Sequence, residues 1–485
     1  MEQNNPTRSP QPAKRTRSRT GCWTCREAGY KCDELKPNCG RCIRLGIHCK
    51  GYASRLKWRS HNAAERRARC KSTSTENDIG SSQGDSPLST SPHSGLSLSE
   101  YPSLSIRPSD MTLEQYRLLH HWIVYTSPLL CVSPIYQTNS FQMHLTPMVL
   151  HSDSPLRHAV LSVAASHLTA SDPSQNLALT AQTHRVSAIT ALREGLNNNI
   201  IAYSDITLAS ILVLEISKQF DNSPRHDVNH LIGAKELILG RGGPQSLTTP
   251  CSRFLLTQVL YHDLLSAVSM GSSPLISHHW LKQENPLESS RGYHSTILQA
   301  VACISELKAR KEALAEAAYN QENALAEFMA AGREIEKELD SMVVSATEPD
   351  QAQTTKAHRS AALIYLYRVV YDIGAPHPLT VSLVRRCIDA IASIHPSSPL
   401  ISAHVWPLFT AGCEATEPQD REFVNQRLVD MYQQRKIGSL RKVRELMEQV
   451  WLSKDFRNTI AGAEQMCRVG CIEVVKSLGE ILQLV

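Results

Sequence analysis

The chain has 485 residues, 41% of them hydrophobic, and its 51 lysines and arginines against 46 acidic residues give a formal net charge of +5. This length exceeds that of a single small domain, and the apolar content is sufficient for a large buried core. With 14 cysteines among 485 residues, the composition excludes a small scaffold held together by disulfides.

Charge is segregated along the chain. Residues 1–72 contain 18 lysines and arginines against 5 acidic residues, a net charge of +13, so the remaining residues carry −8. A basic segment of this density attracts polyanions, nucleic acid first among them, whereas phosphates repel an acidic body. The charge pattern therefore predicts that nucleic acid binds the amino-terminal part of the chain.

Residues 1–20 are polar and basic and are predicted to form a disordered arm, because nothing apolar can be buried there. They lack the apolar segment of a secretory signal, so we expect no secretion. The apolar stretch at residues 206–214 is shorter than the roughly 17 residues of a membrane-spanning helix. We therefore expect no membrane partner.

Six cysteines lie close together after this arm, in a duplicated pattern. The unit Cys-x2-Cys-x6-Cys occurs twice, and the second copy begins 17 residues after the first. In a reducing compartment such a cluster favours metal binding over disulfides. The predicted metal ligands are Cys22, Cys25, Cys32, Cys39, Cys42 and Cys49.

The number of sulfurs predicts how many ions they hold. Zn²⁺ takes four ligands in a tetrahedron, so the three cysteines of one unit cannot complete a site. Two Zn²⁺ ions need eight sulfur contacts from six thiolates, which requires two bridging sulfurs. By the symmetry of the two units, Cys22 and Cys39 are the expected bridges.

The stretch GCWTCREAGYKCDELKPNCGRCIRLGIHCKGYASRLKW resembles the fungal zinc binuclear cluster (Zn2Cys6) transcription factors. It matches their cysteine spacing, with Asp33 after the third cysteine and Pro37 between the units. The resemblance implies that the first and fourth cysteines are shared, and that a short helix enters the DNA major groove over CGG-type triplets. The alternative is a metal module that does not bind DNA.

Two Zn²⁺ and six thiolates sum to a charge of −2, so phosphate contacts must come from surrounding side chains. We predict DNA contacts from the basic residues in and just after the cluster, although a solvated charged face is the simpler interpretation of any one of them. They are Arg26, Lys31, Lys36, Arg41, Arg44, Lys50, Arg55, Lys57 and Arg59. The basic runs at residues 14–19 and 55–71 fit either phosphate contacts or nuclear import.

One departure from the family concerns base recognition. The family commonly has basic residues four and three positions before the third cysteine, where this chain has Ala28 and Gly29. Neither side chain can make the bidentate contact that Arg or Lys makes with guanine. Tyr30 or backbone amides are alternative readers, and the DNA motif stays undetermined.

Residues 61–109 are first basic and then rich in serine and proline, which is typical of a linker. From residue 110 the apolar residues recur with helical spacing, and no run shows sustained alternation of apolar and polar residues. Asp110 is the expected N-cap of a helix that ends before Pro128. Further helices are expected at residues 156–169, 206–220, 228–239, 254–268, 361–371 and 440–451, with a glycine-rich helix stop at residues 240–244.

One helical stretch, residues 304–342, has apolar residues at alternating spacings of three and four, as in a dimer-forming coiled coil. Lys311, Gln321 and Gly332 interrupt the stripe. We favour an intramolecular helix or helical hairpin over a dimer seam.

The body resembles the fungal-specific transcription factor domain, in the form found with acriflavine-sensitivity-type regulators. The strings that carry the resemblance are LLHHWIVYTSPLL, HAVLSVAASHLTA and HLIGAKELILGRGG. It implies a regulatory domain that receives small-molecule or protein signals and influences dimerisation. The predicted fold is a small Zn2Cys6 cluster in residues 21–60, a disordered linker and a large all-α regulatory domain in residues 110–485.

An enzyme in the body is the competing interpretation. His144, His151 and His158 recur every seven residues, but Pro147 and Pro155 are expected to interrupt their helix. His278 and His279 lack a nucleophile elbow or zincin spacing, and no phosphate-binding loop is present. We therefore expect ordinary structural or surface histidines and no enzymatic activity.

These observations predict a nuclear, zinc-dependent, sequence-specific DNA-binding regulator of RNA polymerase II transcription, with two Zn²⁺ ions per cluster. It would control a metabolic or secondary-metabolite gene set. The expected partners are double-stranded DNA, a second copy of the chain, and a small-molecule effector or coregulator protein. The alternative is an interaction protein or coregulator whose zinc module has weak or lost base-specific readout.

Overall fold

The structure is a computed structural model that divides into two compact units, residues 1–61 and 62–485. It describes residues 22, 24–25, 28–35 and 38–50 of the first unit. In the second unit it describes residues 110–131, 139–151, 153–220, 229–277, 295–316, 321–344, 348–479 and 482–484. The predicted arm (1–20) and linker (61–109), as well as His278 and His279, lie outside the described residues. The predicted domain boundaries stay predictions.

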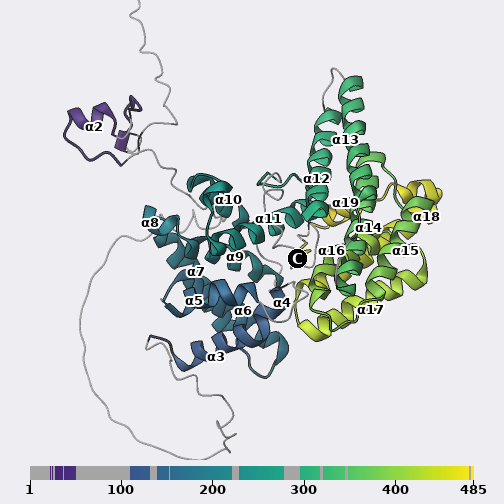
Figure 1. Cartoon of the computed structure of the whole chain (residues 1–485), viewed down its shortest axis with the longest axis horizontal. Helices are drawn as coiled ribbons and strands as arrows, with labels where there is room; N and C mark the ends of the chain where they lie inside the picture. Colours follow the sequence, from purple (N-terminus) through teal and green to yellow (C-terminus); the bar gives the residue numbers. More distant parts are fainter. Residues whose placement is uncertain are drawn as a thin grey trace, which may run out of the picture. The chain divides into compact units, whose positions relative to one another are not determined.

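The described part of the second unit is helical and contains no β-strand (Figure 1). None of its described helices is both long and apolar enough to cross a membrane. The helices of its first half are α3 (Leu113–His121), a π-helix (Trp122–Thr126), α4 (Ser127–Leu130), α5 (Ser140–His151), α6 (Pro155–Ser171), α7 (Ala178–Gly195), α8 (Asn199–Ala202), α9 (Asp205–Ile216), α10 (His230–Gly240) and α11 (Pro250–Met270).

The second half contains α12 (Ser295–Glu316), α13 (Gln321–Ser341), α14 (Pro349–Tyr371), α15 (Pro378–Ala392), α16 (Val405–Cys413), α17 (Pro418–Arg435), α18 (Ser439–Cys467) and α19 (Cys471–Ser477). Short 3₁₀ segments occur at Ser217–Gln219, Pro244–Ser246 and Pro399–His404. The structure confirms all six further helices expected from sequence, and several of them extend well beyond the expected ends. The glycine-rich turn after α10 also ends that helix as predicted, with Gly242 and Gly243 at positive φ.

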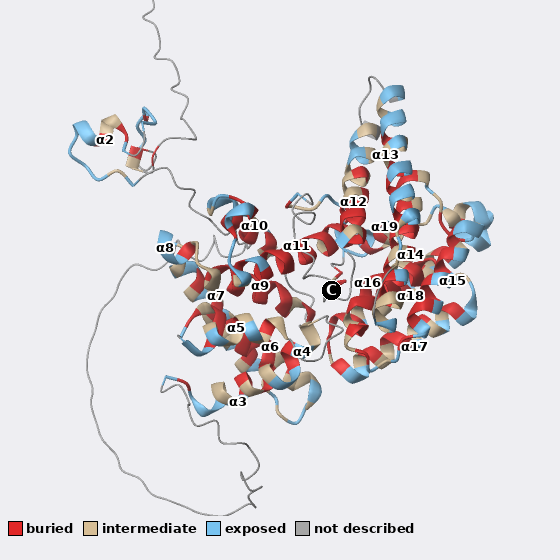
Figure 2. Ribbon diagram, in the orientation of Figure 1, coloured by how far each residue is buried: buried red, intermediate tan, exposed pale blue. Residues whose placement is uncertain are grey.

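Helix α9 forms the centre of the first half and is buried from Thr207 to Ile216 (Figure 2). It packs against α6, α7, α10 and α11. The Oγ of Ser204 accepts a hydrogen bond from the Thr207 amide and so caps the helix. In the second half, α14 has the same central position and packs against α12, α13, α15 and α16. This central position explains why apolar and small residues predominate where the two helices are buried, with Glu215 in α9 and His358 in α14 as buried exceptions.

The predicted start of the first helix is wrong. Thr112 is the N-cap of α3, in a capping box with Gln115, whereas the carboxylate of Asp110 pairs with the buried guanidinium of Arg157 at 2.6 Å. The predicted end before Pro128 is also wrong, since the π-helix joins α3 to α4 and Pro128 lies in the first turn of α4. A proline is tolerated there because the first turn needs no intrahelical N–H donor.

The prolines near the histidine repeat behave differently from one another. Pro155 begins α6, as expected of a helix breaker, but Pro147 lies inside α5 and does not interrupt it. His144 and His151 therefore share α5, while Nδ1 of His158 on α6 lies 2.9 Å from Nδ1 of His184. Among the described residues, only the amino-terminal cysteines form a group able to hold a metal.

Most described residues of the apolar stripe at 304–342 pack inside their own unit, whereas Leu325 is exposed. Helices α12 and α13 lie side by side as a hairpin and both contact α14 (Figure 1). Ile304, Leu307, Phe328 and Leu339 are buried. Packing within the unit also explains the glycine that interrupts the stripe, because a Cβ at Gly332 would lie 2.6 Å from the Val370 side chain. The structure thus confirms the hairpin that the sequence favoured.

Candidate zinc centre and DNA-binding surface

The two Cys-x2-Cys-x6-Cys units in the amino-terminal part of the chain fold in the same way. The backbone amide of Cys25 donates to the sulfur of Cys22 at 3.5 Å, and the amide of Cys42 donates to the sulfur of Cys39 at 3.3 Å. In both units the first sulfur therefore accepts a hydrogen bond from the amide three residues later. Such bonds favour the thiolate form, because they place a positive dipole against the sulfur.

The repeat continues beyond the cysteines. The amide of Ala28 bonds to the carbonyl of Thr24 and that of Leu45 to the carbonyl of Arg41, both at 3.1 Å. Glycine then follows at positive φ in each unit, 74° at Gly29 and 62° at Gly46. A spacing of 17 residues in sequence thus corresponds to one backbone fold used twice.

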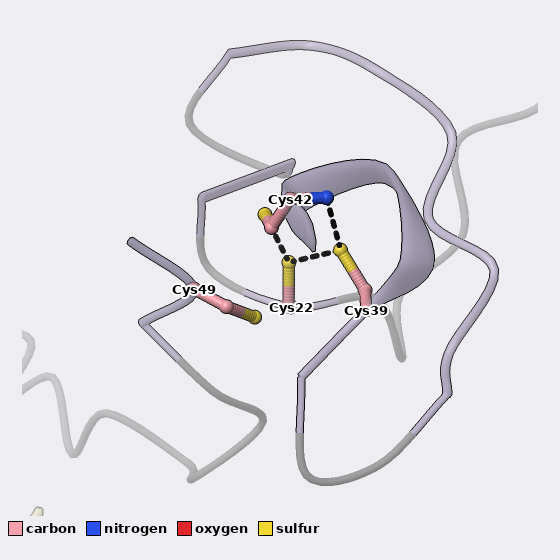
Figure 3. Close-up of side chains that lie close together, drawn as sticks. All are labelled: Cys22, Cys39, Cys42 and Cys49. Atoms are coloured by element: carbon pink, nitrogen blue, oxygen red, sulfur yellow. Dashed lines mark hydrogen bonds between the residues drawn. The ribbon is translucent and has the colours of Figure 1, made fainter. Parts of the chain in front are cut away.

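The six sulfurs form two overlapping groups of four. Cys22, Cys25, Cys32 and Cys39 make one group, and Cys22, Cys39, Cys42 and Cys49 make the other, with all ligand atoms of each group within 4.8 Å of one another. Figure 3 shows the second group, with Cys22 between Cys39 and Cys42. Cys22 and Cys39 belong to both groups, and these are the residues that the symmetry of the sequence predicts as bridges.

The sulfur separations suit zinc. With Zn–S bonds of about 2.3 Å, tetrahedral geometry separates two sulfurs on one ion by about 3.8 Å. The Cys22–Cys39 separation is 3.5 Å, Cys25–Cys39 is 3.7 Å and Cys22–Cys42 is 3.9 Å. The residues present therefore fit two tetrahedral zinc ions that share two sulfurs.

The protein alone does not stabilise these sulfurs as thiolates. Burial raises the pKa of Cys42 to about 12, and it also raises the pKa values of Cys22 and Cys25. Neighbouring sulfurs of like charge disfavour ionisation further. Thiolates can occupy this small volume together only when cations neutralise them, which is the chemistry that Zn²⁺ supplies.

Asp33 links the two units and has a structural role that sequence analysis did not assign. Its carboxylate accepts the amides of Gly40 at 3.0 Å and Arg41 at 3.1 Å, which are the first two residues of α2 (Gly40–Arg44). An acceptor at this position satisfies N–H groups that have no partner within the helix. A Cβ at Gly40 would lie 2.6 Å from Asp33 Oδ2, so the close approach requires glycine.

Thr24 is a second residue that sequence analysis missed. Its hydroxyl donates to the carbonyl of His48 at 3.0 Å and accepts from the amide of Lys50 at 2.9 Å. These bonds attach the end of the second cysteine unit to the start of the first. The only sequence signal is a hydroxyl residue between two cysteines, which is too common to be specific.

The predicted DNA-contacting residues divide into three groups. Lys31, Arg44 and Lys50 are exposed. Arg41 is half-buried, with its guanidinium 4.0 Å from the centre of the Tyr30 ring and Nη1 3.9 Å from the Cys25 sulfur. The remaining five, which lie outside the described residues, are Arg26, Lys36, Arg55, Lys57 and Arg59.

Ala28 and Gly29, which replace the basic residues common in the family, are exposed to solvent. Ala28 is exposed, and an added Cβ at Gly29 would have no neighbour within 4 Å. The φ of 74° at Gly29 nevertheless favours glycine over any other residue. Space is therefore available for a basic side chain at Ala28, whereas the backbone itself accounts for the glycine.

The overlapping cysteine groups define a binuclear zinc module, which this chain combines with a body that is helical in its described residues. Residues 20–59 match the fungal Zn(2)-Cys(6) binuclear cluster domain, and residues 117–482 match the fungal specific transcription factor domain. The second match covers most of the chain, so the chain belongs to this family of fungal transcription factors. Its amino-terminal domain binds two zinc ions, and DNA binding and regulation follow from the two domains.

Known relatives agree with this assignment. The chain is similar to the pestheic acid cluster transcriptional regulator 3 of Pestalotiopsis fici, at 23% identity over 90% of this chain and 94% of that protein. It is 52% identical to the transcription factor phomR of Diaporthe leptostromiformis over 54 residues, 11% of this chain and 8% of that protein.

A third relative is the Zn(2)-C6 fungal-type transcription factor afumD of Aspergillus fumigatus, at 30% identity over 33% of this chain and 35% of that protein. By contrast, the match to phomR spans less than a tenth of that protein, a stretch about as long as a cluster domain. No solved structure matches the chain.

Proposed function

We propose that this chain is a nuclear, sequence-specific DNA-binding regulator of RNA polymerase II transcription, whose zinc cluster docks on DNA and whose helical body controls activity. The single observation that carries the proposal is the pair of overlapping four-sulfur groups, which share Cys22 and Cys39. Lys31, Arg44 and Lys50 are exposed basic residues of the same module.

The proposed zinc ligands are the six cysteines of the two groups. Zinc crosslinks the two units of the repeat when it is bound. The backbone amides of Cys25 and Cys42 stabilise the shared sulfurs, and the carboxylate of Asp33 fixes the start of α2. A bridging sulfur serves both ions, so the loss of Cys22 or Cys39 should remove more metal than the loss of any other cysteine.

Phosphate binding is assigned to the predicted basic residues. Lys31, Arg44 and Lys50 are exposed around the cluster, and each phosphate that they neutralise releases condensed counterions. Affinity should therefore fall steeply as salt concentration rises. Arg41 is proposed to act from its position over Tyr30, where the ring orients the guanidinium by a cation–π contact.

The target genes are proposed from the relatives. Two similar proteins carry names that place them in clusters, the pestheic acid cluster regulator and the ustiloxin B cluster transcription factor of Aspergillus flavus. We infer that this chain controls a metabolic or secondary-metabolite gene set. A second copy of the chain and a small-molecule effector or coregulator protein complete the proposed partners.

Site selection tests the proposal. The full-length zinc-loaded protein is incubated with random double-stranded DNA near physiological salt, and bound sequences are counted with and without a chelator. We expect one enriched motif that disappears with the chelator. The matched control is Cys70→Ser, which changes a cysteine outside the repeat and should leave the motif unchanged.

The second candidate function, an interaction protein without base-specific readout, is favoured by Ala28 and Gly29 at the positions of the usual basic readers. It predicts salt-sensitive DNA binding with no enriched motif. Enrichment that persists after complete zinc removal would contradict both functions, because each depends on a zinc-folded module.

A further inference from the structure

A cavity of about 350 Å³ lies in the second half of the body, between α11, α12, α14, α16 and α19. This volume is within the usual range for small-molecule sites. Its wall is apolar at Ile364, Val369 and Phe409, and polar at Arg368 and Cys471. The cavity therefore gives small solutes access to a thiol that lies beside a charged group.

A buried charge cluster forms the polar side of this cavity. The carboxylate of Glu414 accepts hydrogen bonds from Arg368 at 2.7 and 2.8 Å, from Nζ of Lys454 at 2.7 Å and from the amide of Ala375 at 2.8 Å. The side chains of Lys454 and Glu414 are 0% and 2% exposed. Two cations therefore share one buried carboxylate, and Glu473 and Asp455 also interact electrostatically with Arg368 and Lys454 respectively.

Cys471 lies near the two cations of this cluster. It is half-buried at the first position of α19 and lines the cavity, whereas Cys413, the residue before Glu414, is fully buried. The side chains of Cys413 and Cys471 are hydrogen-bonded to each other, and this contact, with Arg368 and Lys454, lowers the pKa of Cys471 although burial and Glu414 oppose it. Burial raises the pKa of Cys413, so that residue keeps its proton.

We propose that Cys471 is an oxidant-sensitive site, which a small hydroperoxide reaches through the cavity and which Cys413 resolves to a disulfide. Partial exposure, neighbouring cations and an adjacent second thiol are the features of cysteines that react with peroxides. The site is separate from the zinc cluster and does not depend on the proposed DNA-binding function.

The reaction has two steps. The Cys471 thiolate attacks one peroxide oxygen, an S–O bond forms, the O–O bond breaks, and the leaving oxygen takes up a proton as water or an alcohol. The product is a sulfenic acid on Cys471. The Cys413 sulfur then attacks the Cys471 sulfur, the S–O bond breaks, and hydroxide leaves as water with the proton of Cys413. Two thiols are oxidised and one hydroperoxide is reduced.

Other cysteines of the body provide internal references. Cys251 is half-buried like Cys471, but burial raises its pKa to about 11, and burial raises that of Cys387 to about 12. A thiol whose pKa is about 2 higher than usual has an about 100-fold smaller thiolate fraction, while its thiolate is about 10-fold more nucleophilic. Cys251 should therefore react at least about 10-fold more slowly than Cys471.

The first experiment uses the reduced, zinc-loaded full-length protein without any substitution. Substoichiometric hydrogen peroxide is added, free thiols are blocked, and disulfides are mapped by peptide mass spectrometry, with zinc release followed separately. We expect a Cys413–Cys471 disulfide before zinc is lost, and reduced Cys251. A Cys467–Cys471 disulfide, or oxidation of Cys251 at the rate of Cys471, would overturn the proposal.

The second experiment uses Cys413→Ser, which removes the resolving thiol. Peroxide should then leave a Cys471 sulfenic acid that a dimedone probe labels, and no disulfide should form there. Cys251→Ser is the matched control and should keep the wild-type disulfide. Absence of dimedone labelling at Cys471 in a folded Cys413→Ser protein would contradict the mechanism. If that variant does not fold, the mapping of the unsubstituted protein still decides the proposal.

Discussion

The zinc module and the helical body are held together by different forces. The buried cluster of the module consists of cysteines alone, with Cys49 packed against it, whereas apolar residues from many helices form the core of the body. The module has little hydrophobic stabilisation, and its folding should depend on metal. Conditions that destabilise one region should therefore leave the other folded, and five predictions test this contrast.

The largest expected effect is that of zinc removal. Structural zinc supplies an apparent 10–16 kcal/mol, roughly, to small zinc-dependent modules near neutral pH. We expect a strong chelator to abolish DNA binding by the full-length protein while the helical circular dichroism signal and the thermal transition of the body persist. Loss of the body's transition together with zinc would show that the two regions are not independent.

The next effect distinguishes the cysteines of the module. Cys39→Ser should remove a sulfur that both ions share, whereas Cys49→Ser should affect one ion, because Cys49 belongs to only one four-sulfur group. Native mass spectrometry should therefore find less zinc in Cys39→Ser than in Cys49→Ser. Cys70→Ser serves as the control and should keep two ions. Equal zinc content in the first two variants would refute the bridging assignment.

Within the body, the charge cluster on Glu414 should dominate the response to substitution. Glu414→Gln removes the carboxylate that Arg368 and Lys454 share and should lower the free energy of unfolding by about 3–5 kcal/mol. Lys454→Met leaves a neutral Arg368–Glu414 pair and should have a clearly smaller effect. Urea unfolding followed by circular dichroism measures both variants. The reverse order would contradict the central role of Glu414 in this cluster.

Acid should destabilise the body through buried histidines. Burial lowers the pKa of His358 to about 4, as it does for His121, while both titrate near 6.5 when unfolded. The unfolded state therefore binds more protons between these values, and stability is lost as the pH falls from about 6.5 towards 4. His358 alone should contribute about 2 kcal/mol between pH 7 and 5.

Thermal unfolding of the protein and of His358→Gln between pH 7 and 5 measures this contribution. The substitution should flatten the pH dependence if the glutamine variant folds. A His120→Gln variant is the control, because that side chain is only half-buried. An unchanged pH slope in folded His358→Gln would contradict the expectation.

The smallest expected effect is a gain at the DNA surface. Ala28 is exposed, and a lysine there could reach base edges or phosphate. Ala28→Lys should tighten binding to CGG-containing DNA by about 1–2 kcal/mol, roughly 5- to 30-fold, without changing the stability of the body. The control is the same titration with CGG replaced by an AT-rich triplet. Equal gains on both DNAs would indicate a phosphate contact.

The two regions also differ in how far their sequences predict them. The six cysteines lie within 28 residues at regular spacing, so local geometry brings them together, and the bridging pair follows from the repeat. Helical periodicity likewise located the main helices of the body. It placed the helix ends less well. Asp110 is a plausible helix start but pairs with Arg157, and Pro128 is a plausible helix stop but follows a π-helix that continues the chain into α4. Pro147 is also a plausible stop but lies inside α5.

Tertiary structure alone decided which distant residues meet. Arg368, Cys413, Lys454 and Cys471 come from four helices and converge only because α14, α16, α18 and α19 pack together. The sequence determined the helical class and predicts the zinc ligands, because both depend on short-range spacing. The charge cluster and its thiols depend on how separate helices pack, and no periodic pattern in the sequence predicts this packing.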